Sequence, residues 1–141
     1  MIQAQQEPEP VAVHSMTAAE FRIARERLGV SGDWLATRLG VTGRTVRRWE
    51  ADTAPVPDGV AADLRAVEEE TAAFVAAVVE ALRDDEPDDD GARWVTTYAS
   101  DAALMLEHPD SPRSAGWHRA AMGRVAQALP DVRVRYLGDP S

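Results

Sequence analysis

The feature that most limits the possible folds of this chain is a pair of short helical patterns separated by a tight turn, between residues 35 and 50. In the first pattern apolar residues recur three or four positions apart until Gly40, a residue that closes a helix in the left-handed conformation without steric cost. Thr42 can then cap a second helix, in which Val46 and Trp49 repeat the same spacing. The sequence therefore predicts two helices that meet at a turn, the second running from about residue 43 to residue 51.

Two helices joined in this way are typical of the helix-turn-helix unit that binds DNA. Its first helix crosses the DNA backbone and its second lies in the major groove, so the exposed positions at the start of the second helix contact the bases. In this sequence those positions are Thr42, Gly43, Arg44, Thr45, Arg47 and Arg48. We therefore expect a protein that binds double-stranded DNA through residues 42–48.

The charge distribution is compatible with this expectation, although the chain carries a net charge of −9. Between residues 16 and 52 there are seven arginines and five acidic residues, so this segment is slightly basic. Much of the acidity lies in the run 84–90, which contains six carboxylates and one proline. Such a run is typical of a solvated segment extended by its own repulsion, and we interpret residues 84–91 as an acidic linker.

The remaining patterns predict a mainly α protein with four segments. Residues 1–15 are rich in Gln, Glu and Pro and should form a disordered tail. Residues 16–83 should form the helix-turn-helix domain with a long connecting helix. After the linker 84–91, residues 92–141 should form a small α+β dimerisation region.

Within the segment 16–83, capping patterns and apolar spacing define the helices. Thr17 and Glu20 form a capping-box pattern that opens a helix ending at Gly29, and Ser31 can cap the next one. A helix from about 58 to 83 has nearly heptad-like spacing, in the residues Val60, Leu64, Val67, Thr71, Phe74, Val78 and Ala81. This spacing suits packing on the first domain at one end and on a partner helix at the other, and packing within its own subunit is the alternative.

In the C-terminal region, residues 94–98 are β-prone, and residues 132–136 alternate as a half-buried strand does. A short helix ending near residue 107 and an amphipathic helix from 115 to 129 lie between them. Two strands and two helices bury too little apolar surface to form a stable domain on their own. We therefore expect this region to pair with its copy in a second subunit.

Several function classes find no support in the sequence. The chain has no cysteine for a disulfide or a zinc finger, and it has no apolar run long enough to span a membrane. No nucleophile motif, phosphate-binding loop or dinucleotide fingerprint is present. We expect a cytoplasmic protein that is not an enzyme and that needs neither a metal ion nor a cofactor.

The stretch from Thr17 to Gly59 resembles the lambda-repressor-like, or Xre-type, helix-turn-helix. Further motifs narrow the resemblance to small bacterial and phage proteins that include the anti-CRISPR-associated autorepressors. These motifs are Trp49-Glu50, Val56-Pro57-Asp58, Tyr98, His108-Pro109-Asp110 and Gly116-Trp117. One departure is Asp52, where the Xre pattern usually has glycine after the second helix.

The resemblance implies a homodimer, joined through its C-terminal half, that binds an inverted repeat and represses its own operon. It implies base-reading contacts by Arg44, Thr45 and Arg48. We assign phosphate contacts to Ser31, Gly32, Arg38, Thr42, Gly43 and Arg47. The same pattern implies a structural ion pair between Arg25 and Glu50. We place the dimer interface at Trp94, Tyr98, Trp117, Val132, Val134 and Tyr136.

Two other functions fit the same patterns. The chain has features of an antitoxin whose N-terminal half binds DNA and whose C-terminal half binds a partner protein. An arginine-rich helix can also bind structured RNA. A stable homodimer without a co-purifying protein would favour the repressor over the antitoxin.

Overall fold

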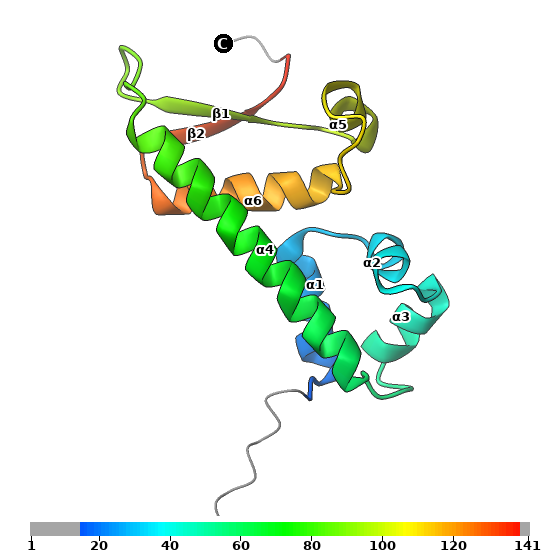
Figure 1. The fold of residues 1–141 in the computed structure, drawn as a ribbon. Coiled ribbons are helices and arrows are strands. Elements are labelled where there is room, and N and C mark those ends of the chain that lie inside the picture. The colour runs from blue at the N-terminus through cyan, green and yellow to red at the C-terminus, as the bar shows by residue number, and fades with distance from the viewer. Residues whose placement is uncertain (1–14, 139–141) are drawn as a thin grey trace, which may run out of the picture.

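The structure is a computed structural model that describes residues 15–138 of the chain (Figure 1). It is mainly helical, with a small parallel sheet of two strands, as the sequence predicts at this level. The predicted disordered tail lies outside the described residues, except for Ser15. In chain order the elements are α1 (Ala18–Leu28), α2 (Gly32–Leu39), α3 (Gly43–Glu50), α4 (Asp58–Arg83), β1 (Arg93–Thr97), α5 (Asp101–Glu107), α6 (Ala115–Ala128) and β2 (Val132–Tyr136).

The first three helices begin where the sequence places their caps. The Thr17 hydroxyl accepts a hydrogen bond from the Glu20 amide at 3.0 Å, and the Glu20 carboxylate accepts one from the Thr17 amide at 3.0 Å. At the starts of α2 and α3 the hydroxyls of Ser31 and Thr42 accept hydrogen bonds from the amides of Trp34 and Thr45, without the reciprocal bond. Gly40 ends α2 with φ of 74°, which a residue with a Cβ adopts only at a cost. The local sequence therefore determines these helix ends, and α3 ends one residue earlier than predicted.

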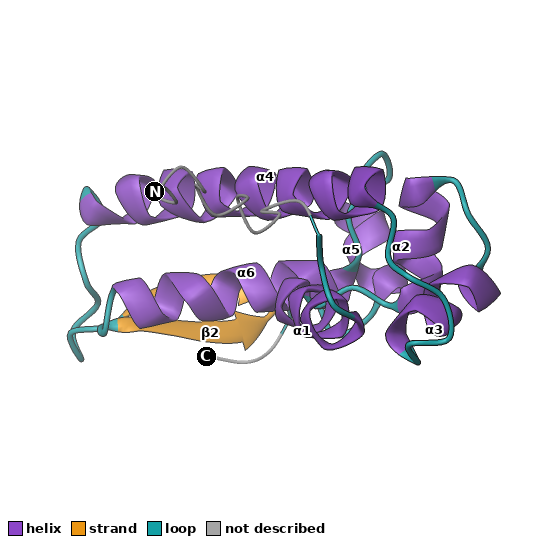
Figure 2. Cartoon of the chain, turned by 90° about the horizontal axis from the view of Figure 1, so that it is seen from below, coloured by secondary structure: helices purple, strands orange, loops and turns teal. Residues whose placement is uncertain are grey.

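The longest helix, α4, runs alongside α1 and α6 and connects the two ends of the molecule (Figures 1 and 2). Leu64 and Val67 on its N-terminal half are buried against the first three helices, and Val79 and Leu82 are buried in the C-terminal half. Ala81 of the predicted apolar stripe is exposed instead. The helix thus packs within its own chain along its whole length. Among the described residues no helix combines the length and apolarity needed to cross a membrane.

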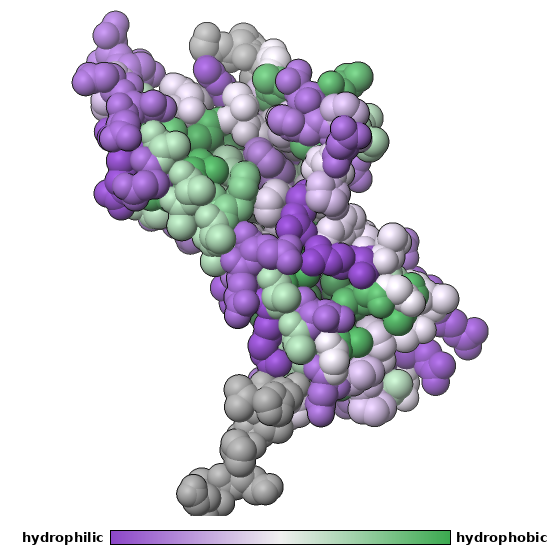
Figure 3. Space-filling view, in the orientation of Figure 1, coloured by the Kyte–Doolittle hydropathy of each residue, from purple (hydrophilic) through white to green (hydrophobic). Residues whose placement is uncertain are grey.

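The outer face of α4 has only small side chains over much of its C-terminal half. Figure 3 shows apolar side chains gathered there, and the alanines at 72, 73, 76 and 77 are exposed. Packing of this face on a partner helix, which the sequence analysis considers, stays a prediction.

The helices α1 to α4 surround the first of two main cores. Phe21 of α1 meets Trp49 of α3 edge to face, with ring centroids 5.7 Å apart, a geometry that aromatic rings favour. The core is completed by residues from all four helices and by Trp117 of α6. Its fully buried members include Phe21, Leu28, Leu35, Val46, Leu64 and Val67.

The C-terminal half is built on α6, which packs against α4 and against both strands. The strands β1 and β2 pair in parallel, with Arg93 opposite Val132 and Thr97 opposite Tyr136. Parallel strands require a long connection, which α5 and α6 supply. The alternation predicts the bounds of β2, and β1 begins and ends one residue before the β-prone run 94–98. Their parallel pairing depends on the connection and is not evident from either strand alone.

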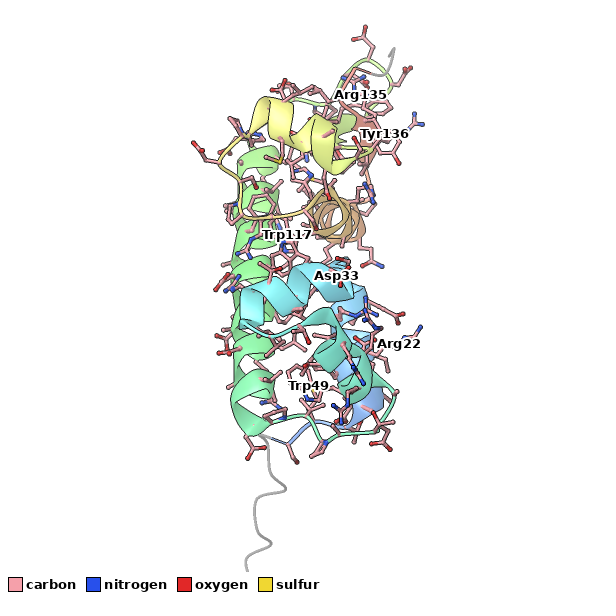
Figure 4. The ribbon with its side chains drawn as sticks, turned by 90° about the vertical axis from the view of Figure 1, so that its right-hand side faces the viewer. Arg22, Asp33, Trp49, Trp117, Arg135 and Tyr136 are labelled. Carbon is pink, nitrogen blue, oxygen red and sulfur yellow. The ribbon has the colours of Figure 1, made fainter. Side chains whose placement is uncertain are left out.

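The two halves meet in a close backbone contact between α1 and α6. A Cβ at Gly116 would overlap the carbonyl oxygen of Gly29, and a Cβ at Gly29 would overlap the carbonyl oxygen of Gly116. Beside this contact, the Trp117 indole donates a hydrogen bond to the Thr71 hydroxyl at 2.9 Å. The helices α1 to α4 and the described C-terminal residues 92–138 therefore share a core through Trp117 (Figure 4).

The acidic segment between α4 and β1 is exposed, as a solvated linker should be, but it has local order. The Asp88 carboxylate accepts hydrogen bonds from the amides of Ala92 and Asp90 and from the Trp94 indole, at 2.8, 3.0 and 3.0 Å. The bond from Ala92, followed by that from Trp94, holds the pKa of Asp88 below its ordinary value. This turn directs the chain from α4 into β1, so repulsion alone does not determine its shape.

The ion pair between Glu68 and Arg124 links α4 to α6 and leads to a prediction on pH dependence. The two terminal guanidinium nitrogens of Arg124, Nη1 and Nη2, donate to the Glu68 carboxylate at 2.8 and 2.9 Å. These bonds hold the pKa of Glu68 below the ordinary glutamate value of 4.5. The ionised form is therefore favoured in the folded state, and its contribution is complete above pH 4.5 and lost as pH falls through the lower folded-state pKa.

Glu68→Gln should accordingly reduce the free energy of unfolding at neutral pH by about 0.5 kcal/mol, a small effect because solvent partly screens the pair. The difference from the wild-type chain should disappear in acid, as measured by urea unfolding across a pH series. Exposed Glu69 provides the matched control, Glu69→Gln. A Glu68→Gln deficit that persists unchanged in acid would contradict the assigned role of the carboxylate.

Candidate nucleic-acid interface

The helix α3 buries one side and exposes three arginines on the other. Val46 and Trp49 are 1% and 5% exposed and pack into the core, whereas Arg44, Arg47 and Arg48 are exposed. The anchored side fixes the orientation of the helix, so the guanidinium groups are displayed on a surface of defined shape. Two predicted base-reading residues, Arg44 and Arg48, therefore lie on the solvent side of the same helix.

The third predicted base-reading residue, Thr45, is half-buried at the start of α3. Its hydroxyl is within 2.9 Å of the Thr42 hydroxyl, which itself accepts a hydrogen bond from the Thr45 amide. Because its hydroxyl already has a partner, the methyl group of Thr45 is the part that we expect to meet a thymine methyl. Thr42 remains exposed at the N-terminus of α3, where amides and the helix dipole favour an anion.

The expected ion pair between Arg25 and Glu50 is present and joins α1 to α3. Arg25 donates to both carboxylate oxygens of Glu50, at 2.6 and 2.9 Å, and also to the Val30 carbonyl at 3.1 Å. The hydrogen bonding of Arg25 to the Glu50 carboxylate, which accepts, is the main cause that raises the pKa of Arg25. Since the carboxylate of Glu50 is neutralised inside the pair, it offers little repulsion to a phosphate near α3.

An acidic side chain lies beside the predicted phosphate contacts of α3. The Asp33 carboxylate is 4.0 Å from an Arg47 nitrogen, and it fills the space that a Cβ would need at Gly43. Both side chains of this ion pair are largely exposed, at 87% and 72%. A pair so exposed is worth little, so Arg47 can exchange Asp33 for a phosphate at small cost.

Arg38, a predicted phosphate contact on α2, is engaged within the chain. Its Nη2 donates to the Glu70 carboxylate of α4 at 3.1 Å. Glu70 also accepts from Arg113 of the segment before α6. Sequence reasoning missed this arrangement because the partners are 32 and 43 residues from Glu70, and no local spacing connects them.

The other predicted phosphate contacts on α2 are the backbone amides at its start. Ser31 is exposed and Gly32 is half-buried. Ser31 lines a small cavity together with Asp101 and Arg119 of the C-terminal half. An anion at this helix start would therefore approach between the two halves of the molecule, beside one acidic and one basic side chain.

The turn after α3 adopts a glycine-like backbone at Asp52. Its φ of 63° lies in the left-handed region. Within residues 15–138 no other non-glycine residue has a positive φ. Aspartate tolerates this region better than most residues do. The departure of Asp52 from the Xre pattern therefore leaves the exit turn in the conformation that glycine would favour.

Five of the six residues predicted for the dimer interface fall into two groups, one buried and one exposed. Tyr98, Trp117 and Val132 are 6%, 4% and 6% exposed and belong to the cores of a single chain, so they cannot also form a surface between folded subunits. This corrects their assignment, which arose because a large apolar side chain in a short segment looks the same whether a core or a partner covers it. Val134 and Tyr136 are exposed on β2.

Trp94, the sixth predicted interface residue, is half-buried under two arginines of β2. The guanidinium carbons of Arg133 and Arg135 lie 4.6 and 4.7 Å from its ring centroid. These cation–π contacts cover part of the indole. Of the residues predicted for the interface, Val134 and Tyr136 on β2 are therefore the exposed ones.

No cluster of three or more His, Asp or Glu side chains suited to a metal ion occurs within residues 15–138. In comparisons with known proteins, no family model matches the chain and no curated protein matches it.

Proposed function

We propose that this protein is a sequence-specific regulator of transcription that binds double-stranded DNA with α2 and α3 as a helix-turn-helix unit. In this proposal α3 enters the major groove, Arg44 and Arg48 each bind a guanine through its N7 and O6 atoms, and Thr45 contacts a thymine methyl. Arg47 and the Thr42 cap bind phosphates. The regulator acts as a homodimeric repressor of its own operon.

The observation that carries the proposal is that the arginine-rich helix α3 is held in one orientation by the core and by an ion pair. Val46 and Trp49 anchor α3 in the core, and the ion pair of Arg25 with Glu50 ties it to α1. Three arginines remain exposed on a helix of eight residues. A helix held in this way can present side chains to base edges without losing much conformational freedom on binding.

The exposed end of β2 supports the homodimer. Val134, Tyr136 and Leu137 are 38%, 42% and 47% exposed, and the sheet has only two strands. An open strand edge with apolar side chains is suited to pairing with another chain. Pairing of this edge with its copy would generate the two-fold symmetry that an inverted repeat requires.

The same surface also supports the antitoxin as a second candidate function, because a different protein can cover an apolar strand edge. Light scattering of the purified chain distinguishes the two candidates. A homodimer that forms without any second protein supports the repressor, and a monomer that binds a co-expressed neighbour supports the antitoxin.

Selection of bound sequences from a random duplex pool tests the proposed function. We expect an inverted repeat whose half-site centres are about 34 Å apart, one turn of DNA. Binding of the selected duplex should weaken steeply with salt, because each neutralised phosphate adds about 0.9 to the slope of log affinity against log salt. A pool without an enriched motif, or a structured RNA that competes equally with the duplex, would count against the proposal.

A further inference from the structure

The helix α5 exposes large apolar side chains on its outer face. Met105 and Leu106 are 53% and 86% exposed, although α5 has only seven residues. Six large hydrophobic residues are exposed within residues 15–138, and five of them belong to α5, to β2 or to the residue after β2. Exposed apolar side chains that gather in this way mark a surface that contacts another molecule.

A cavity lies beside the exposed residues of β2, between this strand and α6. Its volume is about 390 Å³. It is lined by Thr97, Arg119, Gly123, Val134, Arg135 and Tyr136. Gly123 leaves room on the α6 side, because a Cβ at this position would meet no atom within 4 Å. Since a cavity of about 150 Å³ can hold a benzene ring, this one can accommodate a leucine side chain.

The outer side of α5 and the cavity carry opposite charges. At α5, Glu107 and Asp110 are exposed and form no ion pair within residues 15–138. The cavity is lined by Arg119 and Arg135 and by no acidic residue, in a chain whose net charge is −9. Arg119 donates to backbone carbonyls and Arg135 lies over an indole ring, and neither has a carboxylate partner among the described residues. Such complementarity favours association in one orientation.

Both surfaces lie at the same end of the molecule (Figure 1). The helix α5 begins at Asp101, four residues after β1 ends at Thr97. The Leu137 amide, just beyond β2, donates to the Thr97 carbonyl at 2.9 Å. A two-fold axis between two copies of the chain can therefore bring α5 of each copy to the cavity of the other. Both contacts then form together, so the assembly closes as a dimer.

We infer that Leu106 of each subunit inserts into this cavity of the other subunit, where Glu107 lies beside Arg119 and Arg135. Met105 packs on the exposed end of β2. An apolar side chain in a cavity surrounded by paired charges gives the apolar centre and polar rim that protein interfaces have. The inference rests on the homodimer of the proposed function, and it adds α5, which the sequence analysis leaves out of the interface.

Sedimentation of the full chain over a concentration series tests the contribution of Leu106. Leu106→Ser should raise the dimer dissociation constant at least tenfold, because each dimer loses two apolar contacts. The folded subunit should be unaffected, since this side chain is exposed. Ile23→Ser is the matched control, because Ile23 is 56% exposed on α1, and its dissociation constant should stay within twofold of the wild-type value.

Disulfide formation between two variants tests the contact itself, because the chain has no cysteine of its own. A disulfide requires Cβ atoms about 4 Å apart, so a mixture of Leu106→Cys and Gly123→Cys should form a linked heterodimer under mild oxidation. Gly59→Cys is the matched control. Gly59 is also an exposed helical glycine with no atom within 4 Å of an added Cβ, but it lies at the start of α4. Its mixture with Leu106→Cys should not form a linked heterodimer above background.

An unchanged dissociation constant in Leu106→Ser, or equal cross-linking by Gly123→Cys and Gly59→Cys, would overturn this contact and leave the homodimer intact. A wild-type chain that stays monomeric would overturn both the contact and the homodimer. Binding of DNA by α3 is tested separately by the duplex selection, so the two failures are distinguishable. If Leu106→Ser does not fold, the cross-linking experiment decides.

Discussion

Trp117→Ala is expected to lower the free energy of unfolding by about 3–5 kcal/mol, the usual cost of removing a large aromatic side chain from a core. Trp117 is 4% exposed, contacts Phe74 and lies in the core formed by the first four helices. Its removal would also deprive the buried Thr71 hydroxyl of a hydrogen-bond donor. This loss is a large fraction of the stability of a typical domain, so the variant should unfold at much lower urea concentration.

Two further variants separate the causes of this effect. Trp117→Phe keeps an aromatic ring but removes the indole N–H, so it should lose less stability than the alanine variant. Trp94→Ala removes the same side chain from a half-buried position under Arg133 and Arg135 and should cost about 1 kcal/mol. Equal urea midpoints for Trp117→Ala and Trp94→Ala would show that Trp117 does not join the two halves.

Arg44→Ala and Arg48→Ala are each expected to weaken binding of the selected duplex by about 1–3 kcal/mol and to relax the preference at particular base pairs. Both guanidinium groups are exposed on α3, so their removal should not disturb the core. The measurement is a competition titration against duplexes that carry single base-pair changes. Unchanged base preference in both variants would mean that other residues read the sequence.

Arg47→Ala should act differently from the two base-reading variants. We assign Arg47 to a phosphate, so its loss should weaken binding to all duplexes alike and lower the salt slope by about one. Arg83→Ala is the charge-matched control, because Arg83 is exposed at the far end of α4 and forms its ion pair with Glu80. It should leave binding of the selected duplex close to the wild-type value.

Local patterns predicted most of the secondary structure. The capping residues Thr17, Ser31 and Thr42 each satisfy an amide only three positions away, so their effect depends on nothing beyond the first helical turn. The bounds of α4, Asp58–Arg83, also agree with the predicted helix from about residue 58 to residue 83. The ion pair of Arg25 with Glu50 was predicted only through the resemblance, since its partners are 25 residues apart.

Local sequence also predicts some of the functional residues' surroundings, whereas others depend on how distant elements pack. The exposure of Arg44, Arg47 and Arg48 follows from the burial of Val46 and Trp49 on the same short helix, because helical geometry places them on opposite sides. The engagement of Arg38 by Glu70 does not follow in this way, because it requires α4 to pass beside α2. The helix-turn-helix function itself stays a proposal that the duplex selection tests.

The sequence by itself determined the positions of the helices and strands to within about a residue at the ends of α3 and β1, because caps, glycines and apolar spacing act over a few residues. Only the tertiary structure decided which large apolar side chains are core and which are surface. Tyr98, Trp117 and Val132 were expected at a dimer interface and are buried within one chain, whereas Val134 and Tyr136 are exposed. The physical reason is that burial depends on which elements pack together, and the close contact of Gly29 with Gly116 brings together segments 87 residues apart in the chain.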